Sequence, residues 1–266
     1  MQTLIAKLWQ AAFVLGLTAA ASANTWSNIN TYPVPTAGSY PFWIVTGADG
    51  ALWFTEYASD KIGRITISGT ISEYPVPTAG SAPYGIAAGP DGALWFTEYD
   101  GNNIGRITTA GVITEYPVPT ANSGANLIAA GPDGALWFTE YTANKIGRIT
   151  TAGVVTEYPV PTAAAGCAGI ATGLDGALWF TEYSINKIGR ITTAGVVTAE
   201  YLIPTAQNSE PFGITAGPDG ALWFTEYLGG IGRITTGGVV TDYPIPTVGS
   251  QPFGITMGPD ASPPPE

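Results

Sequence analysis

Hydrophobic and polar positions along the chain follow a repeat of about 42 residues. Each repeat has a short apolar segment, an Asp-Gly-Ala-Leu-Trp-Phe-Thr-Glu-Tyr segment, Ile-Gly-Arg-Ile, a glycine turn and a segment ending in Tyr-Pro-Val-Pro or a close relative. The central segment begins five times, at Asp49, Asp91, Asp133, Asp175 and Asp219. Every repeat therefore predicts four short strands.

The turn residues predict how these strands pair. Pro-Asp-Gly at residues 90–92 favours a tight turn, so the first two strands of a repeat are expected to form a hairpin. The prolines of Tyr-Pro-Val-Pro lack the N–H that a central strand needs, which places that segment at an outer edge. Four antiparallel strands per repeat, with no helical periodicity, are typical of propeller blades. We expect an all-β protein, a β-propeller of four-stranded blades with five complete repeats of about 42 residues plus a partial sixth.

The sixth blade is expected to be incomplete. An outer strand is predicted near residues 31–35 and a first strand over residues 253–257, but no middle hairpin accompanies them. A truncated reading frame, a fragment, or a ring completed by a partner would each account for this. Truncation is favoured, because a long exposed sheet edge would invite aggregation.

The N-terminal residues predict export. Lys7 precedes an apolar run from Leu8 to Leu17 and small residues that end at Ala23, a pattern typical of a cleaved secretory signal. The run is shorter than the roughly 20 residues of a membrane span; a retained anchor is the alternative. The expected divisions are a signal peptide (1–23), a propeller domain (24–260) and a Pro-rich C-terminal end (261–266), with a periplasmic or extracellular location and no membrane insertion after cleavage.

Charge narrows the class of partner. Without residues 1–23, eight basic and twenty acidic residues remain, which gives a net charge of −12. Such a chain repels phosphate backbones, so nucleic acid is not an expected partner. The single cysteine, Cys167, has no internal disulfide partner and no histidine to activate it, since the chain contains none. We therefore expect the Cys167 thiol to be buried. The protein itself is expected to be a monomer whose partner is a small molecule or another protein.

Gly-Pro-Asp-Gly-Ala-Leu-Trp-Phe-Thr-Glu, followed by Ile-Gly-Arg-Ile-Thr and Glu-Tyr-Pro-Val-Pro, resembles the repeats of the virginiamycin B lyase (streptogramin lyase) family. The resemblance covers nearly all of the chain after residue 23. It implies a seven-bladed propeller and a Mg²⁺-assisted elimination that opens a cyclic depsipeptide antibiotic, a streptogramin B, at its ester bond. In such a reaction a base removes the proton beside the ester carbonyl while the metal steadies the enolate.

Only some of the family's functional residues have a counterpart in this chain. It implies metal carboxylates at Glu210 and Glu226, but Phe212 stands where the family has its catalytic histidine, and a phenyl ring transfers no proton. A second, substrate-holding histidine is missing for the same reason. No catalytic residue is therefore assigned, and Mg²⁺ is retained as a candidate cofactor on two carboxylates.

Other features of the repeat suggest a structural role for some of these residues. Every repeat has a glutamate at the position of Glu226, seven or eight residues before an arginine, which favours a structural ion pair. These glutamates are Glu56, Glu98, Glu140, Glu182 and Glu226. Glu210 has no acidic counterpart in the other repeats, and a solvated loop glutamate is its alternative reading. The recurring tryptophans are expected between blades as core (Trp53, Trp95, Trp137, Trp179 and Trp223).

The first strands of the blades should project one residue each toward the propeller axis. These candidate ligand-binding positions are Phe42, Tyr84, Asn126, Phe212 and Phe253, with Ala168 completing the set. A concave apolar mouth with few polar groups is typical of a ligand site, although the same rings could simply plug the channel. Three functions stay open: an exported ligand-binding propeller, a Mg²⁺-dependent lyase with a different base, and an envelope or extracellular scaffold.

Overall fold

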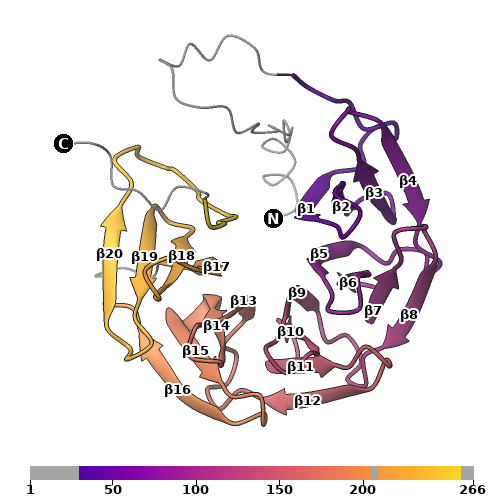
Figure 1. Cartoon of the computed structure of the whole chain (residues 1–266). Coiled ribbons are helices and arrows are strands. Elements are labelled where there is room, and N and C mark those ends of the chain that lie inside the picture. Colours follow the sequence, from indigo (N-terminus) through magenta and orange to yellow (C-terminus); the bar gives the residue numbers. More distant parts are fainter. Residues whose placement is uncertain (1–29, 205–208, 259–266) are drawn as a thin grey trace.

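A computed structural model describes residues 30–204 and 209–258 and confirms the all-β propeller. Five four-stranded antiparallel sheets follow one another around an axis, each in chain order from the inside outward (Figure 1). The predicted signal peptide and the Pro-rich end (261–266) lie outside the described residues. A short 3₁₀ helix, η2 (Tyr183–Ile185), lies between the second and third strands of the fourth blade. In the two described ranges, no helix has the length and hydropathy of a membrane span.

The strands of the first three blades are β1 (Pro41–Thr46), β2 (Leu52–Glu56), β3 (Lys61–Ile65), β4 (Ile71–Pro75), β5 (Pro83–Ala88), β6 (Leu94–Glu98), β7 (Asn103–Ile107), β8 (Ile113–Pro117), β9 (Ala125–Ala130), β10 (Leu136–Glu140), β11 (Lys145–Ile149) and β12 (Val155–Pro159). Those of the last two are β13 (Cys167–Thr172), β14 (Leu178–Glu182), β15 (Lys187–Ile191), β16 (Val197–Leu202), β17 (Pro211–Ala216), β18 (Leu222–Glu226), β19 (Gly230–Ile234) and β20 (Val240–Pro244). The strand that runs into the Tyr-Pro-Val-Pro segment or its close relative is outermost in each sheet, as predicted.

The Asp-Gly turn of each blade anchors the neighbouring strands. Asp133 accepts a hydrogen bond from Trp137 Nε1 at 3.0 Å and another from Arg148 Nε at 2.7 Å. The Arg148 guanidinium also lies 5.9 Å from the centre of the Trp137 ring. The same arrangement recurs in the other four blades.

The predicted pairing of the strand-end glutamates with arginine is therefore wrong. In the β10–β11 register, Arg148 lies opposite Trp137, whereas Glu140 lies opposite Lys145 at the other end of the strand. Glutamate and arginine thus occupy opposite ends of the hairpin, and the arginine pairs with the turn aspartate instead.

Tryptophan packs between the blades, as predicted. Trp53, Trp95, Trp137 and Trp179 are fully buried, and each lies in a cluster with residues of the following blade. Trp223 in the fifth sheet is only partly buried. Burying a large apolar side chain contributes about 1.5–3 kcal/mol, so these contacts account for much of the cohesion between sheets.

The segments assigned to a sixth blade form no strands among the described residues. Residues 31–35 and 253–257 have no ladder hydrogen bonds, because no hairpin in the described ranges pairs with them. Both segments are nevertheless tied to a complete blade. Thr36, directly after the first segment, donates its N–H to Glu73 Oε1 at 2.8 Å, and the Phe253 carbonyl accepts from Thr225 Oγ1 at 2.9 Å. The sheets leave a gap between β1–β4 and β17–β20 (Figure 1).

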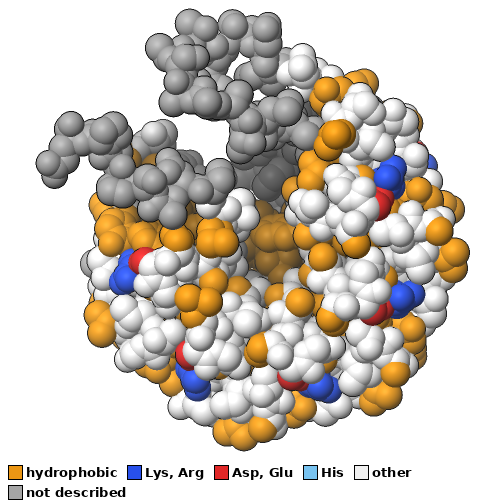
Figure 2. Space-filling model, viewed as in Figure 1, with side chains coloured by type: hydrophobic (Ala, Val, Ile, Leu, Met, Phe, Trp, Pro, Cys, Tyr) orange, Lys and Arg blue, Asp and Glu red, His pale blue; other side chains and the backbone are white. Residues whose placement is uncertain are grey.

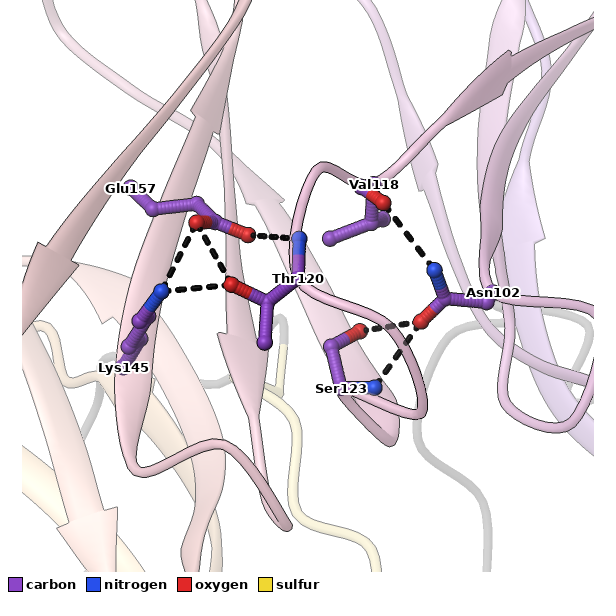
Figure 3. Close-up of polar contacts among 6 residues, drawn as sticks. All are labelled: Asn102, Val118, Thr120, Ser123, Lys145 and Glu157. Carbon is purple, nitrogen blue, oxygen red and sulfur yellow. Dashed lines mark hydrogen bonds and ion pairs between the residues drawn. The ribbon is translucent and has the colours of Figure 1, made fainter.

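The connections between blades are tied down on both sides, as Figure 3 shows for the segment that leads into β9. Asn102 donates to the Val118 carbonyl at 3.0 Å and accepts from the Ser123 N–H at 2.8 Å. From the next blade, Glu157 accepts from the Thr120 N–H at 2.8 Å and pairs with Lys145. The segment that leads into β9 and Asn126 is thus held by both of the blades that it connects.

Candidate functional site

The first strands of the five blades line the axis, and their predicted residues meet there. We call Phe42, Tyr84, Asn126, Ala168, Phe212 and Phe253 the axial collar. Ring centroids are 4.1 Å apart for Phe42 and Tyr84, 3.8 Å for Phe212 and Phe253, and 5.4 Å for Phe253 and Phe42. Phe253 thus links the fifth blade to the first, so the collar is continuous at this point although the sheets leave a gap. Figure 2 shows hydrophobic side chains at the centre of the ring of sheets.

A threonine in each blade holds the collar backbone of the next blade. The fully buried Thr181 accepts a hydrogen bond from the Gly169 N–H at 2.7 Å and donates to the Phe212 carbonyl at 2.9 Å. A Cβ at Gly169 would lie 2.1 Å from that same carbonyl, so glycine permits the close approach. The equivalent donors to the next blade are Thr55, Thr97, Thr139 and Thr225.

A second set of aromatic side chains lies beside the collar. It consists of the tyrosine that ends each Trp-Phe-Thr-Glu-Tyr segment, and the sequence analysis did not predict it. We call this set the tyrosine ring (Tyr57, Tyr99, Tyr141, Tyr183 and Tyr227). The tyrosine ring and the collar residues other than Ala168 line a cavity of about 710 Å³, together with Tyr40, Pro41 and Ala58. Recurrence was the available signal, because a residue repeated at the same end of successive blades must converge around the axis.

Few polar groups reach this cavity. Asn126 is 4% exposed, and its Oδ1 has no hydrogen-bond partner among the described residues. Glu210, which precedes β17 in a left-handed conformation (φ 52°), accepts a hydrogen bond from the Tyr183 hydroxyl. Burial and this carboxylate raise the pKa of Tyr183, and burial raises that of Tyr84. Both phenols are therefore neutral at physiological pH.

The two carboxylates assigned to Mg²⁺ have different surroundings. Glu226 is 4% exposed, and its pKa is raised to about 8 by burial and by a hydrogen bond with Asp242. Its Oε1 lacks a partner, but so does Oε1 of Glu56, Glu98, Glu140 and Glu182, so the orphan belongs to the repeat rather than to a metal pocket. In the described part of the chain no three metal-ligating side chains come together. A site of two carboxylates completed by water stays a prediction, with Glu210 and Glu226 as the residues that would hold Mg²⁺.

The recurring glutamates instead form buried acid pairs with the outer strand. The pKa of Glu140 is raised to about 8 by burial and by the nearby Glu157 carboxylate, and those of Glu98 and Glu182 rise similarly. Burial opposes the ionisation of Glu157 as well, but hydrogen bonds from Lys145 and Thr120 outweigh it and lower the pKa. One carboxyl of the pair is thus protonated and the other ionised.

Cys167 is fully buried at the start of β13, as predicted. Burial is the main cause that raises the pKa of its thiol, and the neighbouring Glu182 carboxylate adds to it. A buried, protonated thiol is a poor nucleophile.

Several known proteins resemble this chain in sequence and fold. The virginiamycin B lyase family model matches residues 6–262. The crystal structure of virginiamycin B lyase from Staphylococcus aureus is 49% identical with a TM-score of 0.84, covering 87% of this chain and 78% of that one. A catalytically inactive His-to-Ala variant of that enzyme, crystallised with quinupristin, matches equally well, over 86% of this chain and 78% of the other. A gluconolactonase from Xanthomonas campestris, at 15% identity and a TM-score of 0.64 over 82% and 80% of the two chains, shares the fold. The repeats, the five described blades and these matches show that the chain belongs to the virginiamycin B lyase family.

Proposed function

We propose that this chain is an exported, monomeric propeller that binds a small ligand in the cavity formed by the axial collar and the tyrosine ring, and that it lacks the lyase reaction of its family. The observation that carries the proposal is the cavity itself: about 710 Å³, walled by aromatic side chains and supplied with few polar groups. Pockets of this size and composition are typical of sites for small organic molecules.

The case against catalysis comes from Phe212. It occupies the position at which the resemblance implies a histidine base, and the whole chain contains no histidine. Phe212 is 6% exposed and stacks on Phe253, so it serves as part of the cavity wall. No step of an elimination can be assigned to a phenyl ring.

Binding without turnover has a precedent in the matched relatives. The Staphylococcus aureus variant that holds quinupristin has one histidine replaced by alanine and is catalytically inactive. Loss of a histidine in that protein therefore leaves a ligand-binding propeller. The present chain contains no histidine, which supports the same behaviour for it.

Two measurements test the proposal. Purified protein is incubated at high concentration with a streptogramin B and Mg²⁺, and mass spectrometry follows the ester bond; we expect the ring to stay closed. A thermal-shift screen of organic cations, neutral aromatics and sugars should raise the unfolding midpoint for one class. Ring opening would establish the lyase instead. No shift with any class would favour the structural scaffold.

A further inference from the structure

We propose that the cavity selects protonated amines, so that the ligand is an aromatic or aliphatic molecule carrying an ammonium group. This inference deepens the proposed function and rests on it. It follows from three features: the aromatic walls, the distribution of charge around them, and the unpartnered carboxamide of Asn126.

Aromatic side chains dominate the walls. Ten aromatic side chains line the cavity, and neighbouring rings contact one another around it, as in Tyr84–Tyr99 at 5.6 Å and Tyr183–Phe212 at 6.3 Å between centroids. The face of an aromatic ring carries a partial negative charge and attracts cations, most strongly in a site from which water is excluded. A space bordered by ten such rings favours a cation over a neutral molecule of equal size.

Basic residues are held away from the cavity. Each of the eight lysines and arginines in the described part of the chain forms an ion pair with a turn aspartate or an outer-strand glutamate. None of them belongs to the residues that line the cavity. No positive charge in this region therefore competes with a cationic ligand.

Carboxylates do lie beside the cavity. Glu210 accepts the hydrogen bond of the Tyr183 hydroxyl, and Asp100 is near enough to Tyr57 to raise the pKa of that phenol, after burial. A phenol that donates to a carboxylate becomes richer in electrons, so its ring attracts a cation more strongly. The Glu210 carboxylate therefore makes the local field negative on its side of the cavity.

Asn126 distinguishes a protonated amine from a quaternary ammonium. Its side chain lines the cavity, and Oδ1 has no hydrogen-bond donor among the described residues. A buried acceptor without a donor is costly, and the terminal torsion of a carboxamide rotates readily. A ligand N–H can supply the missing donor, which a quaternary ammonium cannot.

The test uses four probes of similar size. Isothermal titration at pH 6.5 compares 1-naphthylmethylamine, its neutral analogue 1-naphthylmethanol, the anion 1-naphthoate and the quaternary naphthylmethyl-trimethylammonium. We expect the amine to bind about tenfold more tightly than the alcohol, the quaternary ion to fall between them, and the carboxylate not to bind.

Three variants test whether the preference for the amine arises in this cavity. Glu210→Gln keeps a hydrogen-bond acceptor for Tyr183 but removes the charge, so it should weaken the amine about tenfold and leave the alcohol unchanged. Asn126→Ala should remove the advantage of the amine over the quaternary ion. Tyr158→Phe, on an outer strand, is the matched control and should change neither probe.

The outcomes distinguish the selection of protonated amines from the proposed function, ligand binding in the cavity. Equal binding of amine and alcohol would overturn the selection of cations and leave the axial ligand site standing. Preferential binding of the carboxylate would also overturn it. Absence of binding by all four probes at millimolar concentration would overturn the inference, and the broader thermal-shift screen would then decide the proposed function alone.

Discussion

The hydroxyl of Thr181 donates a hydrogen bond to the carbonyl of Phe212 in the next blade, at 2.9 Å. The same hydroxyl accepts from the Gly169 N–H of its own blade at 2.7 Å. One buried side chain therefore joins two sheets and fixes the backbone of a collar residue. Because the arrangement recurs around the axis, the shape of the cavity depends on a set of threonines that do not line it.

Thr181→Val should lower the free energy of unfolding by about 2 kcal/mol, because the isosteric side chain leaves a buried N–H and a buried carbonyl without partners. Urea denaturation followed by tryptophan fluorescence measures the change. Thr181→Ser keeps the hydroxyl and loses one methyl group, so it should cost only about 1 kcal/mol. Equal losses in the two variants would show that the methyl group, rather than the hydrogen bonds, matters at this position.

Stability should fall as pH rises through neutrality. Four strand-end glutamates have a pKa raised to about 8 from an ordinary 4.5, so in the folded chain they keep protons that the unfolded chain loses above 4.5 (Glu98, Glu140, Glu182 and Glu226). Their contribution is complete below pH 4.5 and is lost progressively up to about pH 8. Carboxylates with a lowered pKa, such as Glu157, act in the opposite sense and lose stability in acid. Unfolding midpoints measured from pH 3 to 9 should therefore be highest at about pH 4–5.

Glu140→Gln isolates one of these groups. Glutamine cannot ionise, so the variant should lose less stability than the natural chain as pH rises from 5 to 8, and the two stability curves should converge or cross in that interval. Urea midpoints across the interval provide the comparison. Parallel curves would mean that Glu140 is ionised in the folded protein.

The thiol of Cys167 should be inert in the folded protein. It is fully buried, and burial raises its pKa, so thiolate forms only when the structure opens. An aromatic disulfide reagent at pH 8 should react on the order of 10³-fold more slowly in buffer than in 8 M urea, in keeping with the small population of open states. Cys167→Ala supplies the blank. Rapid reaction in buffer would place the first strand of the fourth blade in an accessible, loosely packed state.

How much the sequence reveals depends on the range of the interaction. Strand order and the positions of the collar residues follow from local signals, since turn glycines and outer-strand prolines determine the register within a repeat. The partner of Arg148 was mispredicted because spacing alone ignores which end of a hairpin a side chain occupies. The acid pair of Glu140 and Glu157 has no local signal, because it joins strands that are not adjacent in the sheet.

The tyrosine ring shows a different limit. Recurrence indicates a structural residue at Trp137, but it does not separate that residue from Tyr141. Both recur in every repeat, yet Trp137 is fully buried between sheets whereas Tyr141 borders the cavity. Their place along the strand makes the difference: Tyr141 follows the strand at the end where the collar lies. A repeated residue can therefore form a site through symmetry.

Phe212 should contribute to both stability and binding, and two variants can separate these roles. Its ring stacks on Phe253 at 3.8 Å and meets Tyr183 edge to face. Phe212→Ala removes these contacts and leaves a cavity beneath the last described segment, so the free energy of unfolding should fall by about 3 kcal/mol. Phe212→Leu fills most of that space and should cost about 1 kcal/mol.

The leucine variant lacks an aromatic face, so it should bind 1-naphthylmethylamine several-fold more weakly while remaining folded. Urea denaturation and isothermal titration on the same preparations make the comparison, and hydrogen exchange over residues 250–258 reports whether Phe253 stays in place. If Phe212→Leu binds the amine as tightly as the natural chain, Phe212 acts only by filling space, and the attraction for cations must come from the tyrosine ring and Glu210. If the variant loses both stability and binding to the extent of Phe212→Ala, the stack on Phe253 is itself what holds the collar together.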